Sequence, residues 1–483
     1  MNHSLPQTLE MPCTRRRAGV LLPIFSLPSG RLGAEAVDFL EHMAVAGLSV
    51  WQVLPLGPTL SDGSPYQCSS SFALNPAFLD EAGLLADPAF EAGSSLADRR
   101  CGVGANEALL EEFARFSAQA EWLAGYSEFV VLKQQQGQAA WWQWPVAWRD
   151  RHPQAMQDWK TRHQAELFAV AFEQFLLDRQ WRALMAEAHA RGILLYGDLP
   201  IFVAGDSADV WLHRAEFQLT AEGLPVAVAG VPPDYFSATG QRWGNPLFDW
   251  SAMARNEFAW WRARMRRHRE LFDWVRIDHF RGLAAYWSIP AECATAIEGA
   301  WVPAPGAALL AALQRDAGGC LPVIAEDLGV ITDDVIALRD AFNLPGMRIL
   351  QFAFDSDEKN PYLPQNHTQD SVVYTGTHDN NTTLGWWQGL DATQQQRVRA
   401  ALNDDEAMPW ALIDAALNSV AGLAIIPLAD FLALDERGRI NTPGTTVGNW
   451  HWRFDAASLT KDLLRHIAER VAASGRKITT DRA

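Results

Sequence analysis

The pattern of apolar positions divides the chain into short buried runs separated by longer amphipathic stretches. The short runs are rich in Val, Ile and Leu and show little polar alternation, which is typical of strands covered on both faces of a parallel sheet. We expect strands at residues 18–25, 48–56, 193–201, 274–280, 322–329, 347–354, 372–379 and 423–431. Between them lie helical patterns such as residues 165–192, which end at Gly192. Eight strands alternating with helices predict an α/β fold, the (β/α)8 TIM barrel.

Two intervals between the expected strands are too long for a single crossover helix. Residues 57–164 separate the second and third strands, and residues 202–273 separate the third and fourth. Both intervals leave from the carboxyl ends of strands, the side on which TIM barrels carry their active sites. We therefore expect one catalytic barrel domain over residues 1–483, with inserted subdomains at 57–164 and 202–273 that wall the site.

Three carboxylates follow expected strands at equivalent positions. Asp278 lies at the end of the fourth strand, Glu326 at the end of the fifth and Asp379 at the end of the seventh. One such acid by itself is often the cap of the next helix. Three of them at strand ends of one barrel predict a common site at its mouth.

Convergent carboxylates suit the chemistry of the glycosidic bond. The transition state resembles an oxocarbenium ion, and one carboxylate serves as nucleophile while a second donates a proton. The proton donor needs a raised pKa, which burial and a like-charged neighbour provide. Arg276, two residues before Asp278 on the same face of the strand, is the cation that we expect to keep Asp278 ionised and oriented.

The overall charge and hydropathy exclude other classes of partner. The 483 residues include 40 Lys and Arg against 57 Asp and Glu, a formal net charge of −17. An acidic surface repels phosphate backbones, so we expect no nucleic-acid partner. No apolar run reaches the roughly 18 residues of a membrane span, so we expect no membrane contact. The basic and apolar start, "RRRAGVLLPIF", is short, broken by Pro23 and followed by no cleavage site, which argues against a signal peptide.

Cysteine usage and motif content point to a reducing compartment and to chemistry without a cofactor. The five cysteines are odd in number and contain no C-x-x-C pair, which predicts a cytoplasmic protein. The chain has no dinucleotide-binding glycine motif after a strand, no Walker loop and no H-E-x-x-H. We expect neither a metal nor a cofactor. The chain has 21 Trp residues, and we expect many of them in the core. Clustered ones, as in "WWQWPVAW" at 141–148, are candidate platforms for the apolar faces of sugar rings.

Longer motifs resemble those of one enzyme family. They are "SPYQCSSSFALNP" (64–76), "GDLPIFVAGDSADVW" (197–211), "GVPPDYFSATGQRWGNPLFDW" (230–250), "RIDHFRG" (276–282), "AEDLG" (325–329), "YTGTHDNNTTLGWW" (374–387) and "NTPGTTVGNWHWR" (441–453). In this order they are similar to the motifs of the amylomaltases, 4-α-glucanotransferases also called disproportionating enzymes, which are related to the α-amylase superfamily.

The resemblance implies a role for each candidate residue. Asp278 resembles the nucleophile that forms a covalent glucosyl-enzyme, Glu326 the acid/base, and Asp379 the carboxylate that stabilises the transition state. Residues 234–243 resemble a loop laid over the bound glucan. The substrate-binding residues that the resemblance implies are Tyr66, Asp198, Asp234, Gln241, Trp243, Arg276, His378 and Asn449. The expected substrates are α-1,4-glucans: maltooligosaccharides and chains of starch or glycogen.

Two positions depart from the family pattern, and two rival functions remain. Leu74 stands where the family has Gly, and Asn381 stands where Asp is common; both affect local substrate contacts rather than the three carboxylates. The same carboxylates serve an α-1,4-glucan hydrolase that uses water as acceptor. The second alternative is not an enzyme but a glucan-binding protein without turnover. The complete set of three carboxylates argues against it, because binding alone does not require all three.

Overall fold

A computed structural model describes residues 10–233, 237–329, 331–402 and 406–478 of the chain. Its centre is an eight-stranded parallel sheet with the order β10-β11-β12-β1-β2-β3-β6-β9. The sheet curves into a barrel whose last gap is bridged by the Ala325 N–H, which donates to the Pro345 carbonyl at 2.8 Å. The predicted TIM barrel is confirmed. Its strands are β1 (Arg17–Leu21), β2 (Val50–Gln52), β3 (Leu194–Leu199), β6 (Trp274–Ile277), β9 (Val323–Ala325), β10 (Gly346–Ile349), β11 (Ser371–Tyr374) and β12 (Leu423–Pro427).

All eight expected strands exist, and each of them ends earlier than predicted. The expected strand 274–280, for example, stops at Ile277, and residues Phe280–Leu283 form a 3-10 turn. The apolar pattern continues past the last strand residue because side chains of the following turn, such as Phe280, are also buried. The residues of functional interest therefore lie just beyond the strands rather than inside them.

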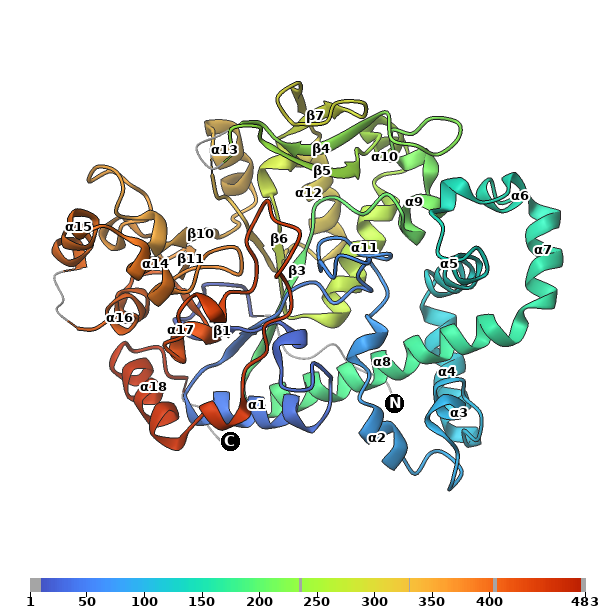
Figure 1. Ribbon diagram of the computed structural model, residues 1–483, viewed down its shortest axis with the longest axis horizontal. Coiled ribbons are helices and arrows are strands. Elements are labelled where there is room, and N and C mark those ends of the chain that lie inside the picture. Colours follow the sequence, from blue (N-terminus) through green and yellow to red (C-terminus); the bar gives the residue numbers. More distant parts are fainter. Residues whose placement is uncertain (1–9, 234–236, 330, 403–405, 479–483) are drawn as a thin grey trace.

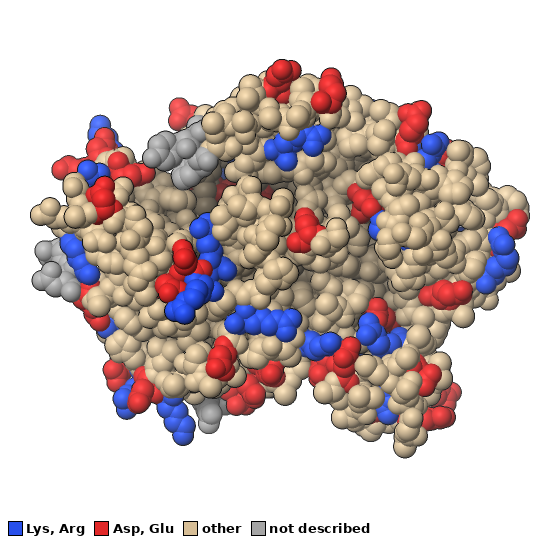
Figure 2. Space-filling model, in the orientation of Figure 1, with Lys and Arg blue, Asp and Glu red and all other residues tan. Residues whose placement is uncertain are grey.

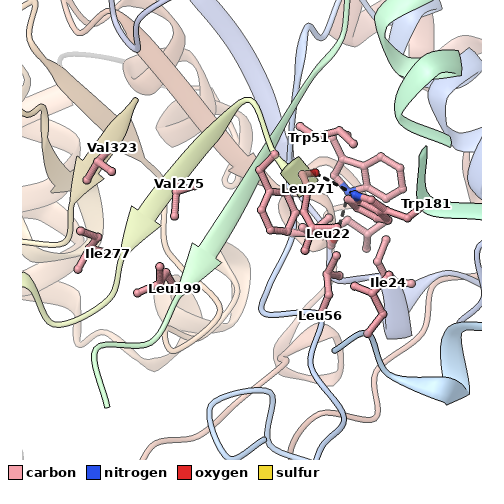
Figure 3. Close-up of a cluster of buried hydrophobic side chains, with 14 of the residues drawn as sticks. Leu22, Ile24, Trp51, Leu56, Trp181, Leu199, Leu271, Val275, Ile277 and Val323 are labelled. Atoms are coloured by element: carbon pink, nitrogen blue, oxygen red, sulfur yellow. Dashed lines mark hydrogen bonds between the residues drawn. The ribbon is translucent and has the colours of Figure 1, made fainter. Parts of the chain in front are cut away.

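Alternation along the strands divides the core into two layers. Tyr196, Trp274 and Ile324 belong to the cluster inside the barrel, and the Tyr374 hydroxyl donates to the Tyr196 hydroxyl at 3.4 Å across it. The intervening residues point outward to the helices, as Figure 3 shows for Leu199, Val275, Ile277 and Val323. Successive residues of a strand face opposite sides, so Arg276, in step with Trp274, is directed into the barrel interior.

Helices surround the barrel and its insertions (Figure 1). Around the barrel lie α1 (Ala34–Val45), α8 (Gln164–Ala190), α11 (Ala259–Leu271), α12 (Gly306–Asp316), α13 (Asp333–Ala341), α14 (Thr383–Gly389), α15 (Ala392–Leu402), α16 (Trp410–Asn418), α17 (Leu428–Phe431) and α18 (Lys461–Ala473). Tryptophan side chains anchor this layer; Trp181 of α8 donates its indole N–H to the Leu271 carbonyl of α11 at 2.8 Å. Within the described segments, no helix combines the length and apolar character needed to cross a bilayer.

The two long intervals fold differently from one another. Between β2 and β3 the chain is helical, with α2 (Glu81–Ala86), α3 (Leu96–Arg100), α4 (Glu107–Gln119), α5 (Leu123–Gln135), α6 (Val146–Arg149) and α7 (Pro153–Arg162). Between β3 and β6 lie α9 (Ala208–Leu212), β4 (Ala227–Val231), β5 (Gln241–Pro246) and α10 (Trp250–Arg255). Their division into subdomains bounded at 57–164 and 202–273 stays a prediction.

A second, antiparallel sheet was not foreseen from the sequence. It has the order β5-β4-β7-β8, and β7 (Ala285–Pro290) and β8 (Ala300–Pro303) come after the fourth barrel strand, outside the interval 202–273. In Figure 1 this sheet lies at the top, above the barrel strands. These strands have only four to six residues, and β5 and β7 mix polar with apolar residues, so the sequence pattern did not identify the sheet before the segments were paired in space.

Candidate active site

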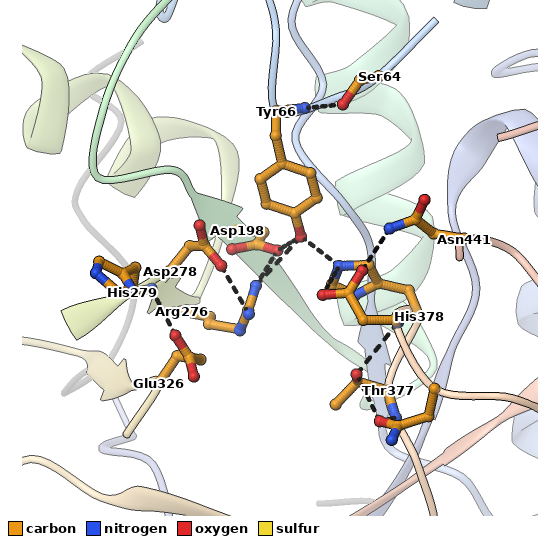
Figure 4. Close-up of polar contacts among 12 residues, drawn as sticks. Ser64, Tyr66, Asp198, Arg276, Asp278, His279, Glu326, Thr377, His378 and Asn441 are labelled. Carbon is orange, nitrogen blue, oxygen red and sulfur yellow. Dashed lines mark hydrogen bonds and ion pairs between the residues drawn. The ribbon is translucent and has the colours of Figure 1, made fainter. Parts of the chain in front are cut away.

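The three predicted carboxylates lie beyond the carboxyl ends of barrel strands, on the side expected. Asp278 follows the last residue of β6 directly, Glu326 follows β9 directly, and Asp379 lies five residues beyond β11. The Glu326 N–H donates to the Ile277 carbonyl at 3.1 Å, which places Asp278 and Glu326 side by side at the ends of the adjacent strands β6 and β9. Figure 4 shows Asp198 and Arg276 between Asp278 and Glu326 on one side and His378 on the other, with Tyr66 above them.

Arg276 is the central cation of this site. One terminal nitrogen donates to Asp198 Oδ2 at 2.5 Å, and the other donates to Asp278 Oδ1 at 2.8 Å. Asp198 and Arg276 are register partners on β3 and β6, and both side chains are buried. The pairing of the strands therefore brings the anion to the cation, and the alternation along β6 brings the cation to Asp278.

Tyr66 and His378 complete the network from other elements. The Tyr66 hydroxyl donates to Asp198 Oδ2 at 2.6 Å and lies 2.9 Å from His378 Nε2, and the two rings stack with centroids 5.3 Å apart. His378 is buried, which lowers its pKa and favours the neutral imidazole. Asp198 is fully buried and accepts hydrogen bonds from Arg276 and Tyr66. Its role as a substrate contact stays a prediction.

The surroundings of Asp278 shift the pKa of its carboxyl group in opposing directions. Burial raises its pKa to about 6, Arg276 opposes this shift, and the carboxylates of Asp198 and Asp379 add to it. A quarter of its side chain, 25%, remains accessible. At neutral pH this carboxylate is ionised and open to a ligand, as a nucleophile requires.

Glu326 is held by two backbone donors. The His279 N–H donates to Oε2 at 2.6 Å and the Leu328 N–H donates to Oε1 at 3.0 Å. His279 has φ 51°, a left-handed conformation that is uncommon for a residue with a side chain and that is often found at functional sites. Burial raises the pKa of Glu326 to about 8; Arg276 and the two N–H donors oppose the shift, and Asp278 adds to it. At neutral pH Glu326 is therefore largely protonated, as a general acid requires.

Asp379 is more accessible than Asp278, with 44% of its side chain exposed against 25%. His378 Nε2 lies 3.4 Å from its Oδ2, and Asn441 Nδ2 donates to its Oδ1 at 2.6 Å. Sequence reasoning missed Asn441, although the residue opens one of the motifs that carry the family resemblance. It also missed the contribution of the His279 backbone, for which the sequence gives no signal.

Gln241 and Trp243 lie together on β5. The Trp243 indole N–H donates to Gln241 Oε1 at 3.1 Å, and the indole ring meets the His279 ring edge-to-face with centroids 4.8 Å apart. This contact connects the small sheet to the turn after β6, next to Asp278. Asp234, in the same predicted covering loop, lies outside the described residues.

The side chain of Asn449 forms hydrogen bonds within its own loop rather than with the other predicted binding residues. Its side chain is buried, accepts from the Thr442 N–H at 2.9 Å and donates to the Thr445 carbonyl at 3.0 Å. These bonds stabilise the loop that contains it. Its role as a substrate contact stays a prediction.

The tryptophan-rich stretch 141–148 is only in part available as a platform. Trp141 and Trp144 are buried, and the Trp141 indole N–H donates to the Gly205 carbonyl at 2.8 Å. For these two residues the expectation of a sugar platform was wrong, because they form the core between the helical insertion and the segment after β3. Trp142 and Trp148 are partly exposed.

Two further features concern the distribution of surface charges and of side chains that could bind a metal ion. Figure 2 shows Lys and Arg scattered among Asp and Glu on the visible face, without a continuous basic patch. In the part of the chain that the structure describes, no group of three or more His, Cys, Asp or Glu side chains is arranged to hold a metal ion.

Comparison with known proteins gives consistent matches over nearly the whole chain. The 4-alpha-glucanotransferase of Synechocystis is 44% identical over 500 residues, covering 96% of this chain and 99% of that protein. The 4-alpha-glucanotransferase of Thermus thermophilus is 46% identical, covering 95% of this chain and 99% of that protein. Among solved structures, the amylomaltase from Streptococcus agalactiae in complex with acarbose superposes with a TM-score of 0.91 at 30% identity, covering 96% of this chain and 100% of that one.

A family model described as 4-alpha-glucanotransferase matches residues 22–108 and 94–459. These ranges contain seven of the eight barrel strands, all but β1, and they contain every residue of the site described above. The chain therefore belongs to the 4-alpha-glucanotransferase family.

Proposed function

We propose that this protein is a retaining 4-α-glucanotransferase that moves α-1,4-glucan segments from a donor chain to a glucan or glucose acceptor. The observation that carries the proposal is the difference between two neighbouring carboxyl groups. Asp278 is paired with Arg276 and has a pKa of about 6, whereas Glu326 has a pKa of about 8. Two carboxyl groups whose environments separate their pKa values are typical of an acid and a nucleophile. Family membership supports the reaction type.

In the first step, Asp278 attacks the anomeric carbon of the donor sugar and forms a covalent glucosyl-enzyme. Glu326 gives its proton to the glycosidic oxygen, and the reducing-end part of the donor leaves as an alcohol. Arg276 keeps Asp278 ionised and holds one of its oxygens, so the other is available for bonding. Protonation of the leaving group makes the C–O bond easier to break.

In the second step, Glu326 acts as a base. Having lost its proton, it accepts the proton of the acceptor 4-hydroxyl while that oxygen attacks the anomeric carbon and Asp278 leaves. The product has the same anomeric configuration as the donor, and both carboxyl groups return to their starting states. Loss of the Glu326 proton is made easier when Asp278 is esterified, because its negative charge, which raises the pKa of Glu326, is then gone.

The remaining predicted residues surround these two carboxyl groups. Asp379 is proposed to bind sugar hydroxyls and to stabilise the positive transition state. Tyr66, His378, Gln241, Trp243 and, from the resemblance, Asp234 and Asn449 are proposed to bind the glucan. Asp198 is proposed to act through Arg276 and Tyr66, because its carboxylate is buried beneath them.

A hydrolase with the same carboxyl groups is the alternative, because water can also attack the glucosyl-enzyme. Incubation with maltotriose as sole substrate separates the two. A transferase yields glucose together with longer maltooligosaccharides and almost no net gain in reducing ends. Chromatography of the products beside a reducing-end count measures both. Reducing ends that rise in step with maltotriose consumption would identify a hydrolase and overturn the transferase proposal.

The cytoplasm remains our proposed compartment. The five cysteines are all free thiols, which a reducing environment maintains. The proposed partners are maltooligosaccharides and chains of starch or glycogen. Fractionation of the native cells with an antibody against the chain tests the location.

A further inference from the structure

The loop that carries His378 and Asp379 is held by a neighbouring segment after β12. Asn441 makes two contacts with it: the side-chain Nδ2 donates to Asp379 Oδ1 at 2.6 Å, and the backbone N–H donates to the His378 carbonyl at 3.1 Å. Figure 4 shows the Asn441 amide directed toward the loop that contains His378. A carboxylate only accepts hydrogen bonds, so the amide nitrogen, rather than the amide oxygen, must face Asp379.

Asn441 is itself fixed by its neighbours. Arg439 donates its Nε–H to the Asn441 carbonyl at 2.8 Å and a terminal N–H to the Asp379 carbonyl at 3.1 Å. The Trp450 N–H donates to the Ile440 carbonyl at 2.8 Å and closes the base of the loop 441–449. The Asn441 side chain is 9% exposed. The donor therefore has one defined direction, and that direction is toward Asp379.

Asp379 needs such a partner more than the other two carboxylates do. Asp278 lies directly at the end of β6 and is held by Arg276, and Glu326 lies directly at the end of β9 and is held by two backbone donors. Asp379 is five residues beyond its strand, and nearly half of its side chain faces solvent. The Asp379 carboxylate contacts His378 Nε2 at 3.4 Å and the side-chain amide of Asn441 at 2.6 Å.

We propose that Asn441 is a positioning residue that fixes the rotamer of the Asp379 carboxylate, so that Oδ2 remains available for the sugar while Oδ1 is held. The proposal rests on the proposed function, because it assigns to Asn441 the orientation of the carboxylate that stabilises the transition state. It predicts that the chemistry of the side chain at 441, rather than its volume, determines the rate.

Two substitutions separate chemistry from volume. Asn441→Asp keeps the shape but places an acceptor against Asp379, and Asn441→Ala removes the donor without adding a charge. Hydrogen bonds to charged groups support a loss of kcat/KM of about tenfold or more for Asn441→Ala. We expect Asn441→Asp to be at least about tenfold worse than Asn441→Ala, because repulsion turns the Asp379 carboxylate away. A residue that only fills space gives the opposite order.

Ligand binding gives a readout that a purely structural role does not change. Acarbose has a flattened ring and a basic nitrogen that mimic the positive transition state, so its affinity should fall by the same factor as kcat/KM. Maltotriose affinity, measured by calorimetry in an Asp278→Asn background that prevents turnover, should change less than about twofold. Proportional losses for both ligands would overturn the proposal, since they indicate general disruption of the site.

Two controls complete the experiment. Val447→Ala alters the same loop at a side chain that points to solvent, with 85% of the residue exposed, and should leave kcat/KM and acarbose affinity unchanged. Asp379→Asn tests the proposed function separately: if this variant keeps near-normal activity, the role of Asp379 fails. If Asp379→Asn is impaired but Asn441→Asp is as active as Asn441→Ala or better, the role of Asn441 alone is wrong.

Discussion

Asp198 and Arg276 form a buried ion pair at the end of two adjacent barrel strands, with Arg276 donating to Asp198 Oδ2 at 2.5 Å. The side chains are 0% and 4% exposed, so neither charge is compensated by water. The same guanidinium donates to Asp278 and to the Tyr66 hydroxyl. The orientation of the proposed nucleophile therefore depends on an anion that is itself shielded from solvent.

Asp198→Asn should destabilise the fold and lower activity together. The substitution leaves the buried Arg276 with less compensating charge, and breaking a buried ion pair costs about 3–5 kcal/mol. Urea unfolding measures the stability and kcat/KM measures the function. Asp462→Asn, in an exposed pair with Arg465, is the matched control and should cost less than about 1 kcal/mol. Equal stability losses in the two variants would contradict the importance of the buried pair.

Asp278→Asn should abolish turnover while leaving the fold intact. The amide is a poor nucleophile, and removal of a nucleophile lowers kcat by several orders of magnitude, on the order of 10⁴-fold or more. Product formation from maltotriose measures the loss, and circular dichroism checks the fold. Asp333→Asn, an exposed residue at the start of α13, serves as control. Near-normal turnover in the Asp278 variant would exclude it as the nucleophile.

Glu326→Gln should slow both half-reactions with natural glucans, because one residue supplies the proton and then removes it. A glucosyl fluoride has a leaving group that needs no protonation, so the first step should recover and the glucosyl-enzyme should accumulate. Mass spectrometry of peptides from the trapped protein should place the adduct on Asp278. An adduct on another residue would show that the assigned roles are wrong.

The pH profile of kcat/KM should be bell-shaped. Asp278 must be ionised to attack, so the rate falls as the pH drops below about 6. Glu326 must be protonated to donate, so the rate falls as the pH rises above about 8. The two groups interact, and the limbs report apparent pKa values of the pair. In Glu326→Gln with a glucosyl fluoride, fluoride release in the first turnover should lose the alkaline limb and keep the acid limb; an alkaline limb that persists would point to another acid.

Trp243→Ala should shift the balance from transfer toward hydrolysis. The ring of Trp243 covers the side of His279, next to the nucleophile, and its loss opens that side to water. The ratio of reducing ends formed to maltotriose consumed measures the shift. Trp301→Ala, on β8 of the same small sheet and 40% exposed, should leave the ratio unchanged. An unchanged ratio in the Trp243 variant would remove Trp243 from the wall of the site and leave the transferase function in place.

The sequence alone determined the barrel and the positions of its proposed catalytic groups. Strands buried on both faces leave a strong apolar signal, because no alternation with polar residues interrupts it. Once the fold is a parallel barrel, Asp278 and Glu326 must lie at its carboxyl side, since all strands run in one direction. The resemblance of the motifs to those of a known family then indicated the role of each carboxylate, which the spacing of the residues alone does not indicate.

Only the tertiary structure decided how these groups are held. Asp198 and Arg276 are 78 residues apart in the chain, and their contact follows from the register of β3 and β6. The Asn441 contact with Asp379 joins segments 62 residues apart. The burial of Trp141 and the pairing of β7 with β4 are likewise long-range, and sequence periodicity reports only which face of an element is apolar. The pKa values of Asp278 and Glu326 arise from burial and from charges on other strands, which exist only once the chain has folded.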